Sequence, residues 1–121
     1  MRSVRLVVVV VVALLLGVVA SGSASAAIVE ECQAQLAALR ADTVAARSSF
    51  TNQRDVDVLL AKLDAASTKL AQGKKADAAQ KLVDFQGTLT ALATAPKPKV
   101  DPAVAERLIT EAQTVVGCIL A

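Results

Sequence analysis

Residues 56–85 have the sequence VDVLLAKLDAASTKLAQGKKADAAQKLVDF, in which two apolar patterns of helical period flank a single glycine. On each side of the glycine, apolar residues recur at steps of three and four, as one face of an amphipathic helix requires. They are Val56, Leu59, Leu60, Leu63, Ala66 and Leu70 before the glycine, and Ala78, Leu82 and Phe85 after it. Gly73 stands where a C-terminal helix glycine belongs, and so short a link predicts two antiparallel helices.

The same period extends in both directions from this pair. Before it, Val29, Cys32, Leu36, Leu39, Thr43, Ala46 and Phe50 share one helical face, and after it Ala105, Leu108, Ala112, Val115 and Ile119 share another. Asn52 is placed as an N-cap, and Asp101-Pro102 follows a proline loop as an N-cap with proline at the first helical position. The pattern predicts helices near 28–49, 54–72, 75–93 and 102–120. We expect an all-α, small antiparallel up-down bundle, built either from four helices or from a three-helix core crossed by the first helix.

The first 26 residues have the features of a secretory signal peptide. Residues 1–5 are basic, residues 6–20 are apolar, and Ala24-Ser25-Ala26 fits the A-x-A cleavage pattern. As a helix the apolar run rises roughly 22 Å, which is short of the ~30 Å hydrocarbon core. We expect a leader over residues 1–26 and one helical domain over residues 27–121. Cleavage after Ala20 and an uncleaved N-terminal anchor are the alternatives.

Removal of the leader leaves no net formal charge. Of the 13 Lys and Arg residues, Arg2 and Arg5 leave with it, so 11 basic residues remain against 11 Asp and Glu. A neutral chain whose aromatic residues are two phenylalanines offers little attraction for nucleic acid and no row of stacking platforms. We expect no nucleic-acid partner, no membrane span after leader removal, and a monomer.

The chain has two cysteines, Cys32 and Cys118. In an up-down-up-down bundle the start of the first helix and the end of the fourth lie at the same end, and export leads to an oxidising compartment. A redox-active pair would usually form a C-x-x-C motif, and zinc would need further Cys or His ligands, which this sequence does not supply. We expect a structural disulfide, no metal and no cofactor.

From about Asp55 to residue 120 the chain resembles the FIMAH domain, a small helical module of secreted bacterial proteins. The resemblance is carried by LLAKLDAASTKLAQGKKADAAQKLVDF (59–85) and KVDPAVAERLITEAQTVV (99–116), with the Gly73-Lys74 turn at its centre. That family usually accompanies secreted hydrolases, lyases or peptidases as an accessory module. The resemblance therefore implies an accessory role without catalysis, although this sequence adds an N-terminal helix and the cysteine pair.

Catalytic groups do not converge in this sequence. It has no histidine, which removes the Ser-His and Cys-His couples, and its carboxylates fit solvated helix faces. We therefore expect a protein that is not an enzyme. A hydrolase that works without histidine is the opposing hypothesis.

Four lysines form a candidate interaction surface. Lys74 and Lys75 follow Gly73, and Lys97 and Lys99 lie in the proline loop, where they would meet an anionic cell-wall polymer or membrane surface. A solvated face is the simpler interpretation. Gly87 and Gly117, inside the third and fourth helices, mark either close helix approaches or tolerated positions.

The function expected from these features is that of a secreted or cell-envelope-associated helical module. It would bind another secreted protein or the envelope through a rigid helix face. A carrier that holds a small apolar ligand between its helices is the alternative.

Overall fold

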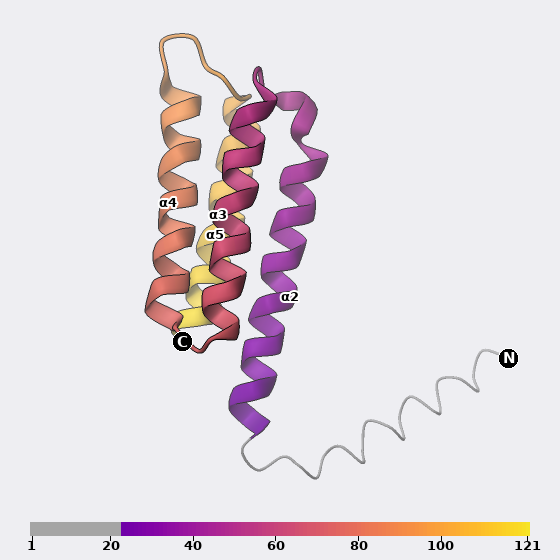
Figure 1. Ribbon diagram of the computed structural model, residues 1–121. Coiled ribbons are helices and arrows are strands. Elements are labelled where there is room, and N and C mark those ends of the chain that lie inside the picture. The colour runs from indigo at the N-terminus through magenta and orange to yellow at the C-terminus, as the bar shows by residue number, and fades with distance from the viewer. Residues whose placement is uncertain (1–22) are drawn as a thin grey trace, which may run out of the picture.

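The computed structural model describes residues 23–121, which fold into four α-helices joined by short connections. The helices are α2 (Ser23–Ala45), α3 (Gln53–Ala71), α4 (Lys75–Thr94) and α5 (Pro102–Leu120), and the 3-10 helix η1 (Arg47–Ser49) lies between α2 and α3. Successive helices run antiparallel, so the chain goes up, down, up and down (Figure 1). The predicted all-α bundle is therefore confirmed. The predicted leader falls largely on residues 1–22, outside the described residues.

The first helix is a full member of the bundle. It packs against α3 and α5, and α4 packs against the same two helices from the opposite side. The N-terminal end of α2 reaches beyond the other helices at the end of the bundle where α3 turns into α4 (Figure 1). Of the two arrangements expected from the sequence, the structure has the four-helix one.

The predicted bounds of the first helix were wrong at both ends. The α-helix begins at Ser23, because Ala24, Ala26 and Ala27 are strong helix formers, and it ends at Ala45. After Ala46 the chain tightens into η1, with the Ser49 amide donating to the Ala46 carbonyl at 2.8 Å. This tightening carries Phe50 into extended backbone, where it pairs with Val100 across an antiparallel bridge. Both side chains are buried there.

The predicted caps are confirmed. Asn52 Oδ1 accepts from the Arg54 amide at 2.8 Å, and Asp101 Oδ1 accepts from the Ala103 amide at 2.9 Å, with Pro102 opening α5. At the end of α3, Gly73 has a φ of 78°, its amide donates to Leu70, and the next amide donates to Lys69, each at 2.9 Å. This pair of bonds is a Schellman motif, which stops α3 and turns the chain into α4.

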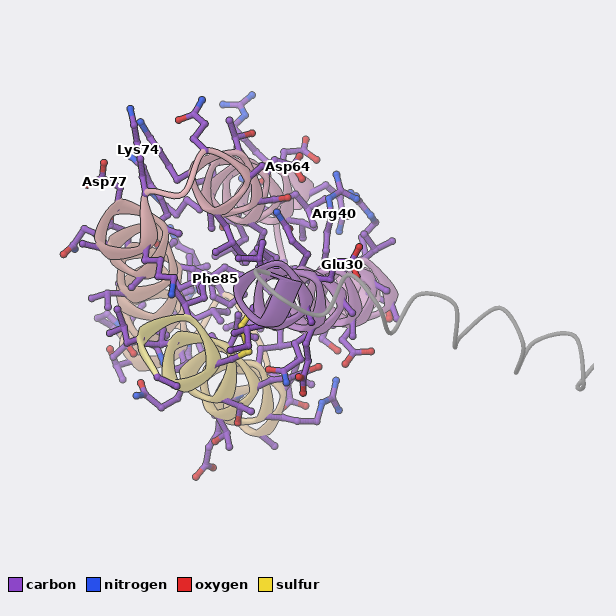
Figure 2. The ribbon with its side chains drawn as sticks, turned by 90° about the horizontal axis from the view of Figure 1, so that it is seen from below. Glu30, Arg40, Asp64, Lys74, Asp77 and Phe85 are labelled. Carbon is purple, nitrogen blue, oxygen red and sulfur yellow. A yellow bond between two sulfur atoms is a disulfide. The ribbon has the colours of Figure 1, made fainter. Side chains whose placement is uncertain are left out.

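The core lies between the four helices and contains the predicted stripes. Phe85 is fully buried, and in Figure 2 its label lies at the centre of the bundle seen end-on. Its fully buried companions include Leu39, Leu59, Leu63, Leu70, Leu82, Leu89, Leu108 and Ile119. The core role expected for both phenylalanines is thus confirmed. Within residues 23–121, no helix combines the length and the apolar character that crossing a membrane requires.

The two helical glycines are not needed for close helix approach. A Cβ built on Gly87 or Gly117 would meet nothing within 4 Å, and both residues are exposed. Gly73 also has open space, but its positive φ strains any residue with a Cβ. Of the three, only Gly73 is therefore required by its backbone conformation, and alanine could replace Gly87 and Gly117.

Gly87→Ala is expected to raise the free energy of unfolding by about 0.5–1 kcal/mol, because alanine loses less backbone entropy in a helix. Gly73→Ala is the matched control, and we expect it to lower that free energy by about 1 kcal/mol through left-handed strain. Urea unfolding of the oxidised proteins measures both. A Gly87→Ala protein less stable than the wild type would contradict this expectation and show that a neighbouring group occupies the space of the added methyl group.

Candidate functional site

A disulfide joins α2 to α5 near one end of the bundle. Cys32 and Cys118 are bonded, and their Cα atoms lie 5.7 Å apart. The bond is visible in yellow between the two helices in Figure 2. Cys32 is 1% exposed, whereas Cys118 is only partly buried. The predicted pairing is confirmed, and Cys32 lies in the third turn of α2.

The disulfide closes a loop that contains most of the described chain, and the end of the bundle where it lies is called the stapled end below. Its sequence separation is 86 residues, for which the chain-entropy account gives roughly 4–5 kcal/mol of stabilisation. That is a large part of the roughly 5–15 kcal/mol by which native proteins are stable.

Besides their shared apolar core, α2 and α3 are joined by hydrogen bonds and an ion pair that lie near the surface. Gln33 Nε2 donates to the Ser67 carbonyl at 3.0 Å, and the Ser67 hydroxyl donates back to Gln33 Oε1 at 2.8 Å. Two turns further on, Arg40 donates to both carboxylate oxygens of Asp64, at 2.7 and 3.2 Å. These two side chains are 45% and 57% exposed, so the ion pair contributes less than about 1 kcal/mol. Figure 2 shows the pair across the α2–α3 seam.

The α2–α5 seam contains a carboxyl pair. Burial raises the pKa of Glu111 on α5 to about 7, and the hydrogen bond and negative charge of Asp42 on α2 act in the same direction. Arg107, also on α5, lowers it in part. Below neutral pH the Glu111 carboxyl therefore keeps its proton and can hydrogen-bond to Asp42, whereas above it two carboxylates face each other.

The same seam includes an unpaired polar atom. Gln35 Oε1 on α2 is buried and has no hydrogen-bond partner among the described residues. A buried acceptor left without a donor costs about 1–3 kcal/mol. Gln35 therefore adds no hydrogen bond through this oxygen to the attachment of α2 to α5.

Small hollows follow both seams of α2. The hollow toward α3 has a volume of about 110 Å³ and is lined by Gln33, Leu36, Ala37, Arg40, Leu63, Asp64 and Ser67. The one toward α5 has a volume of about 160 Å³ and is lined by Gln35, Ala38, Glu111, Thr114 and Val115. Packing is thus incomplete on both sides of this helix.

The four lysines singled out in the sequence do not form one surface. Lys74 and Lys75, here called the basic turn, lie at the stapled end of the bundle, and Lys97 and Lys99, the lysine loop, lie at the opposite end (Figure 1). Between them runs α4 with its 20 residues, about 30 Å at 1.5 Å per residue. All four side chains are exposed. Asp77 lies beside the basic turn in Figure 2 and offsets part of its charge.

The base of the lysine loop is fixed by backbone hydrogen bonds. The Lys99 amide donates to the Leu92 carbonyl and the Thr51 amide donates to the Lys99 carbonyl, each at 2.9 Å. The Asp101 amide donates to the Ser49 carbonyl at 3.1 Å. Next to the loop is an open surface hollow of about 560 Å³, lined by Ser48, Ser49, Thr51, Pro98, Val100, Asp101 and Pro102.

The sequence predicted neither the Asp42–Glu111 pair nor the backbone hydrogen bonds that fix the lysine loop. Asp42 and Glu111 each look like part of a solvated helix face, and only the rotation of α2 against α5 brings them together. In residues 23–121, no three Asp, Glu, His or Cys side chains gather as a metal site would require. The one sequence signal for the bridge between Phe50 and Val100 was Phe50 itself, an apolar residue beyond the predicted end of the first helix.

Comparisons of the chain with protein-family models, with curated proteins and with solved structures find no match. The resemblance of residues 55–120 to the FIMAH domain therefore stays a prediction.

The carboxyl pair gives the protein a specific pH dependence. Because the pKa of Glu111 is raised in the folded state, its stabilising contribution is complete below about pH 4.5 and is lost as the pH rises to about 7. Between pH 4.5 and pH 8 we expect the wild type to lose about 1 kcal/mol more stability than Glu111→Gln, after allowance for solvent screening.

Chemical denaturation of both proteins at the two pH values measures this difference. Glu106→Gln, on the exposed side of the same helix, is the matched control and should follow the wild type. Identical pH profiles for wild type and Glu111→Gln would contradict the assignment of the carboxyl pair.

Proposed function

We propose that this protein is an exported helical module without catalytic activity, which binds a secreted protein or a component of the cell envelope. The disulfide is compatible with an extracellular location, since such bonds persist in oxidising compartments. The basic leader with its apolar run supports export.

The lysine loop is the observation that carries the proposal. Three backbone hydrogen bonds and the buried Phe50–Val100 bridge hold its base, so two exposed ammonium groups are presented with little left to order on binding. The adjoining open hollow is lined by Ser and Thr side chains and by Asp101. Such a surface suits a partner that offers an anionic group beside hydrogen-bonding groups, as envelope polymers and acidic protein surfaces do.

The FIMAH resemblance supports an accessory role for the module. In that family the helical domain accompanies secreted enzymes, so a chain of this kind would act on such an enzyme in trans. The basic turn and the lysine loop lie at opposite ends, which gives the module two separate surfaces for this purpose.

A carrier for a small apolar ligand is the alternative function. The hollows that flank α2, of about 110 and 160 Å³, are smaller than the ~300–1,000 Å³ typical of ligand pockets. A carrier would therefore need α2 to move outward. Extraction of the purified protein with organic solvent, followed by mass spectrometry, tests this alternative by detecting a co-purified ligand.

A pull-down with paired variants tests the binding proposal. The oxidised protein is immobilised and exposed to culture supernatant and to envelope fractions of its host. We expect one retained component whose binding falls at least about tenfold in Lys97→Ala/Lys99→Ala, because two of its charge contacts are removed. Lys74→Ala/Lys75→Ala, which removes the same charge from the other end, should retain the component.

Loss of retention in the basic-turn variant alone would move the binding surface to the stapled end. Equal retention by all variants and by a control that is both reduced and unfolded in urea would contradict the proposal. An envelope polymer and an enzyme are then told apart by the salt dependence of binding and by protein identification.

A further inference from the structure

The attachment of α2 to the bundle differs from that of the other helices. Its buried side chains are two leucines, Leu36 and Leu39, together with Cys32 and Thr43. By comparison, α3 alone buries four leucines, Leu59, Leu60, Leu63 and Leu70, besides Val56. The Thr43 hydroxyl donates to the Leu39 carbonyl at 2.9 Å, within its own helix, and so does not tie α2 to a neighbour.

Both seams of α2 are weaker than the seams on either side of α4. Toward α3 it relies on the exposed Arg40–Asp64 pair and on Gln33 with Ser67. Toward α5 it meets the Glu111 carboxyl and leaves the Gln35 amide oxygen without a partner. Hollows follow α2 on both sides. The noncovalent contacts of α2 are therefore weak for a helix of its length.

The disulfide supplies what these contacts lack. It fixes the N-terminal half of α2 to the last turn of α5, while the C-terminal end of α2 is joined through η1 to α3. The helices α3, α4 and α5 bury continuous apolar stripes against one another and are joined by a Schellman turn and the fixed lysine loop. Neither of those two connections passes through the disulfide.

We propose that α2 is a detachable helix, latched by the Cys32–Cys118 disulfide onto a three-helix core that stays folded when a dithiol reductant opens the bond. The inference is independent of the binding function proposed above. It concerns which part of the fold the disulfide maintains.

The opening reaction is a thiol–disulfide exchange. A thiolate of the reductant attacks Cys118 Sγ, since that residue is the less buried of the two, and the Cys32 thiolate leaves and takes up a proton. The second thiol of the reductant then attacks the mixed disulfide and releases the Cys118 thiolate, which is protonated in turn. Two electrons pass from the dithiol to the protein, and the reductant ends as a disulfide.

Hydrogen exchange measured by mass spectrometry tests the latch. The oxidised protein is compared with the same protein after phosphine reduction of its folded state, and with Cys32→Ser/Cys118→Ser. We expect amides of α2 to exchange at least about tenfold faster in both comparisons, while amides in the middle of α3, α4 and α5 stay within about twofold of the oxidised protein.

Arg40→Ala with the disulfide intact is the matched control, because it removes a contact of the same helix and leaves the latch. Its α2 amides should exchange within about twofold of the wild type. The proposal is overturned if all four helices lose protection together on reduction, or if α2 keeps its protection. It is equally overturned if Arg40→Ala releases α2 as much as reduction does.

Discussion

The chain reverses direction at Gly73, where a φ of 78° lets α3 end in a Schellman motif, and this reversal sets the position of every other helix. With α4 folded back on α3, their leucine stripes face each other and enclose Phe85. The proline loop then returns α5 beside α4, which brings its last turn to the Gly73 end. Only a helix that starts at that same end can place Cys32 against Cys118. The disulfide is thus possible because of the helix directions that the turn at Gly73 sets.

Local signals in the sequence predicted the parts of the fold that depend on local chemistry. Asn52, Asp101 and Gly73 work as caps because each acts on backbone groups within a few residues. The predicted end of the first helix was wrong because Ala46 and Phe50 continue its apolar period beyond the last helical residue, Ala45. Phe50 instead lies in extended backbone and pairs with the distant Val100, a contact that periodicity does not describe.

The candidate sites were predicted less well than the fold for a similar reason. The cysteine pair was found because topology alone brings the two residues together. The four lysines do not form one surface, because two successive connections of an up-down bundle lie at opposite ends, and the sequence grouping overlooked this consequence of its own topology. The Asp42–Glu111 pair depends on the rotation of α2 against α5, and on both helices these residues border the solvated face. An interhelical polar pair of this kind can be found only from the three-dimensional structure.

The placement of the latch and of the lysine loop at opposite ends makes their physical effects separable. The hydrogen bonds that fix the lysine loop come from Ser49, Thr51 and Leu92, and none of these residues belongs to α2. Outward movement of α2 at the stapled end would leave those bonds in place, because η1 still joins α2 to α3 at the loop end. A partner held by the lysine loop would then remain bound to the reduced protein, whereas a partner that contacts the basic turn would meet a changed neighbour. The geometry would therefore separate the binding surface proposed at the lysine loop from the latch proposed at the other end.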